Sequence, residues 1–190
     1  MIAPKDPHAF ANRDELDAWL RAHHETATEL WVRIFKKATG RPTVSWEDLV
    51  EVALCWGWID GQRRSFDDES FVQRLSPRRA KSMWSTKNRD TALRLIAEGR
   101  MQPAGQAHVT AAKADGRWEQ AYAGPATMEM HEDFVRALDR APAAKAQFAK
   151  LKRSEVFSIY HGIQTARRAE TRARRIEKAI ELLEEKGKGE

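Results

Sequence analysis

The sequence predicts an α+β protein with its strands in the first half of the chain and helices throughout the second. Two observations carry this prediction. Residues 29–37 are dense in β-branched and aromatic side chains, and two further candidate strands, 58–66 and 70–75, flank an acidic turn. After Pro77, apolar side chains instead recur at helical spacing.

The first predicted element is a helix that begins after Asn12. Asn12 is a typical N-cap, and Asp14 and Glu15 follow in the first turn, where the helix dipole favours negative charge. The apolar stripe of this helix consists of Leu16, Trp19, Leu20 and His23. Residues 29–37 follow as a strand that is apolar on most of both faces.

A second helix is predicted from Ser45, which with Asp48 resembles a capping arrangement, and Gly57 is placed to end it. Residues 58–66 and 70–75 then form an antiparallel hairpin. Further helices are expected over residues 85–99, 103–116, 134–138, from Pro142, from Ser154 and over 170–185. Gly124 and Pro125 interrupt the helical pattern, so we expect an α+β module at 1–122 and a helical module at 131–186.

Composition and charge set broad limits on function. The net charge of +5 permits an anionic partner, but acidic and basic residues alternate along most of the 190-residue chain, which favours a solvated mixed-charge surface. The single cysteine, Cys55, excludes an intramolecular disulfide. The first residues lack the apolar stretch of a secretory signal, and no apolar run is long enough to span a membrane. We therefore expect a cytoplasmic protein.

Several segments together resemble one family. They are ALCWGWIDGQRRSFDDESFVQRLSPRRAKSMWSTKN, AEGRMQPAG, KADGRWEQAY and SEVFSIYHGIQTARRAETRARRIEKAIELL. This series is similar to the YdeI/OmpD-associated family, often called bacteriocin-protection proteins, over nearly the whole chain. The resemblance implies a YjbR/CyaY-like N-terminal part, with a small antiparallel sheet packed by helices, and a helical C-terminal bundle. It also implies protection against antimicrobial or envelope stress, but no particular reaction.

The predicted hairpin carries candidate binding residues. If residues 58–66 alternate regularly, Asp60 and Arg64 share one face and Arg63 lies on the other. A carboxylate beside a guanidinium is most often a structural ion pair. Alternatively, Asp60 orients Arg64 or Arg74 toward an anionic ligand, because a guanidinium matches the geometry of phosphate and carboxylate.

The segment after the hairpin adds the basic run SPRRAK at residues 76–81, the aromatic ring of Trp84 and a helix start at Ser85. Guanidinium groups and the free N–H groups of a helix N-terminus attract anions, and an aromatic ring offers a stacking surface. The structural alternative is that Ser85 only caps its helix. We predict a basic-aromatic edge that binds an anionic small molecule or an acidic partner, formed by Arg63, Arg64, Arg74, Arg78, Arg79 and Trp84. The candidate ligand-binding residues are these six together with Asp60, Gln73 and Ser85.

Three other functions stay open. An enzyme or metal-handling protein would use a cleft around Asp60, Gln73 and Arg74. A nucleic-acid-binding protein would use the same edge with the basic residues of 167–175, but the sequence has no nucleic-acid-binding motif. An interaction protein acting through the C-terminal helices would expose an apolar patch between Val156 and Leu183.

Catalysis, cofactors and metals have little support. Cys55 lies near the apolar face of a helix, which favours a small buried side chain over a nucleophile. The chain has no phosphate-binding loop and no nucleophile elbow. The histidines are scattered, and the turn Asp67, Asp68, Glu69 is typical of solvated turns. We therefore predict no cofactor and no metal site, and these residues favour a binding protein over an enzyme.

Overall fold

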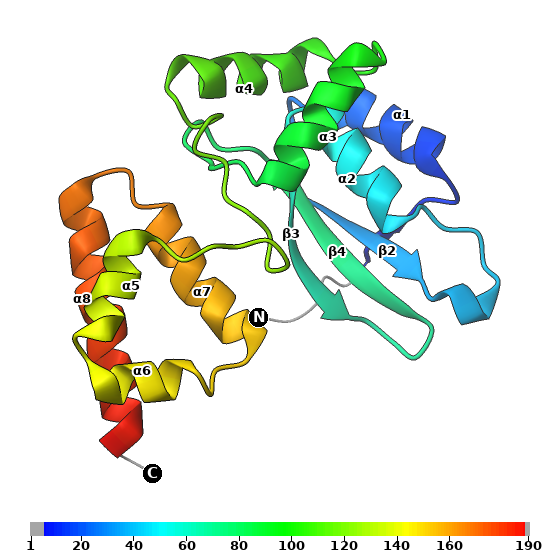
Figure 1. Ribbon diagram of the computed structural model, residues 1–190. Coiled ribbons are helices and arrows are strands. Elements are labelled where there is room, and N and C mark those ends of the chain that lie inside the picture. The colour runs from blue at the N-terminus through cyan, green and yellow to red at the C-terminus, as the bar shows by residue number, and fades with distance from the viewer. Residues whose placement is uncertain (1–5, 189–190) are drawn as a thin grey trace. The chain divides into compact units, whose positions relative to one another are not determined.

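The computed structural model describes residues 6–188 and combines a four-stranded sheet with helices and a helical C-terminal region (Figure 1). The predicted α+β fold class is thereby confirmed. Within the described part, residues 6–82 and 88–119 form one compact unit, and residues 83–87 and 120–188 form the other. We call them the N-terminal unit and the C-terminal unit.

The sheet belongs to the N-terminal unit and has the strand order β1-β2-β4-β3. Its strands are β1 (His8–Ala9), β2 (Leu30–Phe35), β3 (Trp58–Ser65) and β4 (Ser70–Pro77). Strand β4 pairs antiparallel with both β2 and β3, which confirms the predicted hairpin. The parallel pairing of β1 with β2 was not expected, because a two-residue strand leaves no alternation in the sequence.

The two faces of the sheet differ in what they carry. Leu30, Val32 and Ile34 share a face with their partners Leu75, Gln73 and Phe71, and this face also carries Trp58. Helices α1 (Arg13–His23) and α2 (Trp46–Cys55) lie along this side (Figure 1). Trp58 packs edge-to-face on Trp19 of α1, with ring centroids 6.2 Å apart. We call the opposite side the arginine face; it carries Trp31, Arg33, Arg64, Val72 and Arg74.

A β-bulge interrupts strand β3. Asp60 pairs with Leu75 and Arg63 pairs with Gln73, so Gly61 and Gln62 together oppose Arg74 alone. The extra residue reverses the alternation of side chains beyond it. The expectation that Asp60 and Arg64 share a face is therefore wrong: Asp60 lies on the helix-covered side with Arg63, and Arg64 lies on the arginine face.

The predicted helix starts in the N-terminal unit are confirmed. Asn12 Oδ1 accepts the backbone N–H of Glu15 at 3.1 Å, and Ser45 Oγ accepts that of Asp48 at 3.0 Å. Gly57 follows α2 with a φ of 73°, a left-handed conformation that a glycine adopts without strain. Trp56 and Trp58, on either side of it, are buried in the core as expected.

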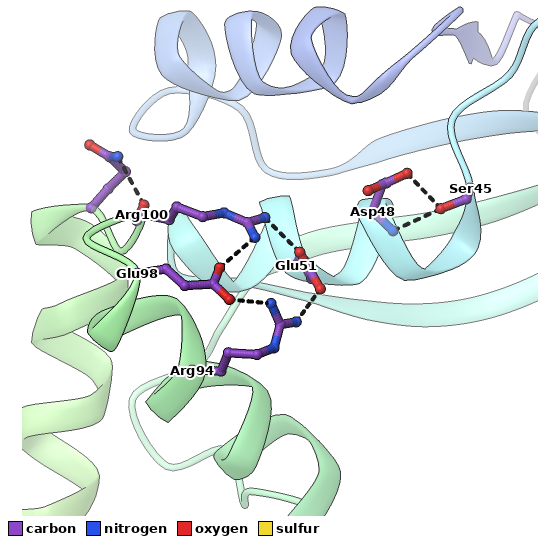
Figure 2. A network of polar contacts seen from close by, with 7 residues as sticks. Ser45, Asp48, Glu51, Arg94, Glu98 and Arg100 are labelled. Atoms are coloured by element: carbon purple, nitrogen blue, oxygen red, sulfur yellow. Dashed lines mark hydrogen bonds and ion pairs between the residues drawn. The ribbon is translucent and has the colours of Figure 1, made fainter.

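Figure 2 shows the polar network that joins α2 to the following helix, α3 (Thr86–Ala97). Glu51 on α2 pairs with Arg94 and with Arg100, whose Nη2 lies 2.5 Å from Glu51 Oε2, and Glu98 bridges the two arginines. Burial alone would raise the pKa of Glu51, but hydrogen bonds from Arg94 and Arg100 outweigh it and lower that pKa. The network is a structural brace within the N-terminal unit.

The remaining helices agree with the sequence pattern in number and order. They are α4 (Pro103–Ala114), α5 (Glu132–Asp139), α6 (Pro142–Phe148), α7 (Arg153–Gln164) and α8 (Ala169–Lys188), and a short 3-10 turn, η1 (Lys37–Thr39), follows β2. Ser154 does not cap α7, because the helix begins one residue earlier and Glu155 Oε2 accepts the N–H of Lys152 at 2.9 Å. None of the helices described between residues 6 and 188 has the length and apolar character needed to cross a membrane.

The C-terminal unit has an apolar core of its own. Side chains from α5, α6, α7 and α8 meet there, namely Phe134, Leu138, Ala144, Ile163, Ile176 and Leu183. The rings of Phe134 and Phe148 pack edge-to-face with centroids 5.3 Å apart. These contacts explain why the amphipathic stripes in this part of the sequence face inward.

Candidate functional site

Cations and an aromatic ring meet on the arginine face of the sheet. The Arg64 guanidinium lies over the ring of Trp31, 5.4 Å from its centroid. Across the strand pair, Trp31 stands opposite Arg74, and Arg74 Nε donates to Glu29 Oε2 at 2.9 Å. Arg64, Trp31 and Arg74 therefore form one continuous group, which was not expected because regular alternation over residues 58–66 would place Arg64 on the same face as Asp60.

Arg33 ties the acidic turn to the same face. Its Nε donates to Ser70 Oγ at 2.9 Å, and its Nη2 pairs with Asp67. The Ser70 hydroxyl, and after it the backbone and Arg33, lower the pKa of Asp67. The guanidinium also lies over the rings of Phe35 and Phe66. Asp67 thus serves the hairpin structure.

A shallow cavity lies where β4 leaves the sheet. Its volume is about 360 Å³, and its walls come from the loop after α1 and from the end of β4. Two guanidinium groups, three hydroxyl groups and one carboxylate line it; the residues are Glu25, Thr26, Ala27, Thr28, Arg74, Ser76, Pro77 and Arg79. Arg74 and Ser76 have the same strand parity, so the cavity continues the arginine face.

Arg74 and Arg79 differ in how they are held. Arg74 is 37% exposed and is oriented by its ion pair with Glu29. Arg79 is exposed, and within residues 6–188 no ion pair to it is found. The cavity therefore combines one positioned guanidinium with one that can adapt to a ligand.

Gln73 was a predicted ligand-binding residue, but its side chain forms a hydrogen bond to the backbone of the bulge instead. Its side chain is 2% exposed, and its Nε2 donates to the carbonyl oxygen of Gly61 at 2.9 Å. Gln73 lies on the helix-covered side and Arg74 on the arginine face, because neighbouring strand residues point to opposite faces. Asp60, Gln73 and Arg74 thus do not converge on the single cleft that the enzyme alternative requires.

Arg63 lies apart from the arginine face, and Arg78 is buried. Arg63 lies over the ring of Phe71 at 3.8 Å from its centroid, on the helix-covered side. Arg78 is only 4% exposed, and its backbone N–H donates to the carbonyl oxygen of Gly57 at 2.9 Å. Burial lowers the pKa of His108, and the positive charges of Arg78 and Arg117 lower it further.

Trp84 and Ser85 belong to the C-terminal unit although they follow Arg79 closely in sequence. The carbonyl oxygen of Trp84 accepts the N–H of Tyr122 at 3.0 Å, and Ser85 bridges to Tyr122. Helix α3 begins at Thr86. The predicted basic-aromatic edge is therefore distributed over both units, and Arg64, Arg74 and Arg79 are the members that lie along the arginine face and its cavity.

Sequence reasoning missed Trp31, Ser76, Thr26 and Thr28. Trp31 had a signal, since it alternates with apolar residues in 29–37 and had to lie opposite them. The threonines had none, because a loop becomes part of a site only through its tertiary contacts. Among the described residues, no group of three or more His, Cys, Asp or Glu side chains is arranged to hold a metal ion.

A larger groove lies within the C-terminal unit, between α5 and α8. Its volume is about 1050 Å³, and alanine and isoleucine side chains such as Ala137, Ala173, Ile176 and Ile180 form its apolar part. Arginine side chains of both helices, Asp133 of α5 and glutamate side chains of α8 flank it. Leu182 and Val135, in the same unit, are 55% and 46% exposed.

Comparisons with known proteins divide the chain in a similar place. Residues 8–108 match the family described as a domain of unknown function (DUF8412), and residues 127–186 match the family described as "Bacteriocin-protection, YdeI or OmpD-Associated". The expected YdeI/OmpD-associated resemblance is thus confirmed for the C-terminal part, whereas a YjbR/CyaY-like N-terminal part finds no support. No curated protein and no solved structure matches the chain. Because the match over residues 8–108 spans more than half of the sequence, the protein belongs to the DUF8412 family, with a C-terminal segment similar to the bacteriocin-protection family.

Proposed function

We propose that this protein acts in the cytoplasm in protection against bacteriocins or related stress, and that its N-terminal unit binds an anionic small molecule at the arginine face. The match over residues 127–186 is compatible with the protective role. The convergence of Arg74 and Arg79 on one cavity carries the binding proposal. The function therefore joins a stress-related C-terminal segment to a ligand-binding sheet.

The lining of the cavity favours an anion with several acceptor oxygens. A guanidinium donates paired hydrogen bonds to phosphate or carboxylate, and the hydroxyls of Thr26, Thr28 and Ser76 add further donors. At about 360 Å³ the cavity lies at the lower end of the range, about 300–1,000 Å³, that small-molecule sites occupy. The ligand is accordingly a small metabolite with phosphate or carboxylate groups.

The carboxylates near the cavity oppose an anion, but weakly; Glu25, which belongs to the lining, is 85% exposed and is screened by water. Glu29 is 50% exposed and Arg74 is 37% exposed, so water screens their ion pair. Exposed pairs contribute roughly 0–1 kcal/mol, less than a charge-assisted hydrogen bond to a bound phosphate. Arg74 can therefore exchange Glu29 for a ligand.

Binding can be measured by calorimetry with inorganic phosphate, a nucleoside triphosphate and citrate as probes. Arg74→Gln and Arg79→Gln should each weaken the best probe about tenfold or more, because each removes charge-assisted hydrogen bonds. Lys37→Gln, at an exposed lysine of η1, is the matched control and should bind like the wild type. Equal affinity in all four proteins, or no binding of any probe, would refute the proposed site.

Single-stranded DNA, added as a probe in the same assay, distinguishes a nucleic-acid-binding protein from one that binds a small anion. Binding through the phosphate backbone weakens steeply as salt rises, with a slope set by the number of phosphates contacted. Tight, strongly salt-dependent DNA binding together with no binding of small anions would favour that alternative.

The protective role has its own test. A bacteriocin-sensitive strain that expresses the protein should survive a bacteriocin challenge better than one with an empty vector, and Arg74→Gln should reduce that survival. If the wild-type protein gives a strain no gain in survival, the protective role is contradicted. The proposal that the arginine face binds an anion would then depend on the calorimetry alone.

A further inference from the structure

A small polar cavity lies within the C-terminal unit and shares one lining residue, Arg172, with the groove between α5 and α8. Its volume is about 190 Å³. His131 at the start of α5, Gln164 at the end of α7, Arg167 just beyond it and Arg172 in α8 line it together with Gln120. Ile163, which is 2% exposed, forms an apolar part of the wall. None of the residues that line this cavity is acidic.

A carboxylate outside the lining holds two of these side chains in place. Arg172 Nε donates to Asp133 Oδ2 at 3.3 Å, which leaves the Nη groups at the outer end of the guanidinium as donors. His131 Nδ1 accepts the backbone N–H of Asp133 at 3.2 Å and lies 3.3 Å from its Oδ2. A neutral ring that accepts at Nδ1 and a charged imidazolium both carry a proton on Nε2. Asp133 therefore positions His131 and Arg172 as donors.

The helix ends around the cavity add to its positive character. His131 is the N-cap of α5, where the positive end of the helix dipole favours an anion. The C-terminal end of α7 has the opposite dipole, but Arg175 donates to the carbonyl oxygen of Gly162 and to Thr165 Oγ1 there. That guanidinium offsets the negative end of α7.

We propose that this cavity binds a small oxyanion of the phosphate or sulfate type. Two guanidinium groups, two carboxamides and an imidazole N–H supply the donors that its oxygens require. The volume of about 190 Å³ falls below the roughly 300–1,000 Å³ of sites for drug-sized ligands, so a single oxyanion fits and a nucleotide does not. This site is independent of the cavity at Arg74 and Arg79, which lies in the other unit.

The test is a nuclear magnetic resonance titration of the full chain with inorganic phosphate. Saturable shifts are expected for the side-chain amide of Gln164 and the backbone signals around His131 and Arg172. Arg172→Gln should weaken phosphate at least tenfold, and Gln164→Leu should weaken it severalfold. Arg174→Gln, an exposed neighbour on α8 outside this cavity, is the matched control and should bind like the wild type.

Gln164→Leu matters because Arg172→Gln also removes the contact with Asp133 and can loosen the helices. If Gln164→Leu and Arg167→Gln both bind phosphate as the wild type does, the site is refuted. Shifts confined to the arginine face, abolished by Arg74→Gln, would likewise refute it while supporting the proposed function. Shifts at Gln164 that survive Arg74→Gln would support this site whatever happens at the other.

Discussion

The side-chain amide of Gln73 donates a hydrogen bond to the carbonyl oxygen of Gly61 at 2.9 Å, inside the bulge of β3. A bulge disrupts the hydrogen-bond ladder of its strand, and a buried polar group without a partner is destabilising. Gln73 thus stabilises the irregularity that moves Arg64 to the arginine face. The residue matters to the candidate site by shaping the strand rather than by reaching a ligand.

Replacing Gln73 should therefore cost stability. Gln73→Leu removes the donor to Gly61 and should lower the free energy of unfolding by about 1–3 kcal/mol. Urea denaturation followed by fluorescence measures it. Gln106→Leu, at a partly exposed glutamine of α4, is the control and should change stability little. Equal stabilities of the two variants would show that the bulge does not depend on the amide.

Helix α4 packs closely against the end of α2 at Gly105. A Cβ at this position would lie 2.4 Å from the carbonyl oxygen of Cys55 and 2.5 Å from that of Leu54. Backbone atoms cannot yield cheaply, so Gly105→Ala should destabilise the protein by about 1–3 kcal/mol or more.

The matched control for Gly105 is the helical Gly162 of α7, where a Cβ would meet no atom within 4 Å. Gly162→Ala should leave stability unchanged or raise it by up to about 1 kcal/mol, because alanine favours the helix. Calorimetric melting temperatures of the two variants should shift in opposite directions. A Gly105→Ala protein as stable as the wild type would contradict the close packing of α4 on α2.

The Glu51 network predicts a pH-dependent contribution to stability. The pKa of Glu51 is lowered in the folded protein, so its stabilising effect is present above the usual glutamate pKa of about 4.5 and is lost as the pH falls through the folded value. Glu51→Gln should cost about 1 kcal/mol at neutral pH, as expected for a partly exposed network.

Denaturation measured at neutral and at acidic pH distinguishes this effect from a general loss of packing. The difference between wild type and Glu51→Gln should shrink below pH 4.5, where Glu51 becomes protonated. A difference that stays constant across that range would mean that the carboxylate charge is not what stabilises α2 against α3. Glu119→Gln, at an exposed glutamate, serves as the control.

Cys55 should be chemically inert in the folded protein. Burial raises the pKa of its thiol to about 11, and the side chain is 3% exposed. A thiol reagent at pH 8 should therefore label the native protein very slowly and the urea-denatured protein at once. Rapid labelling of native protein would contradict the interpretation of Cys55 as a buried core residue and reopen a role for it as a nucleophile.

Most helices and strands could be predicted from the sequence, because they depend on interactions between residues that are close together in the chain. Asn12, Ser45 and Gly57 act within a few residues of themselves, and the hairpin joins neighbouring segments, so each was predictable. The α+β class followed from the same signals. The family resemblance of the C-terminal part was visible too, in the continuous segment 154–183, which lies within the matched residues 127–186.

Only the tertiary structure decided which arginines lie together. The sequence placed Arg64 with Asp60, but one extra residue in the bulge reverses every later side chain, and the amide that holds the bulge comes from another strand. Trp84 follows Arg79 by five positions yet belongs to the other unit, because its backbone pairs with Tyr122. Spacing along the chain records local geometry, whereas a binding site depends on contacts between distant segments, and these form only when the core packs.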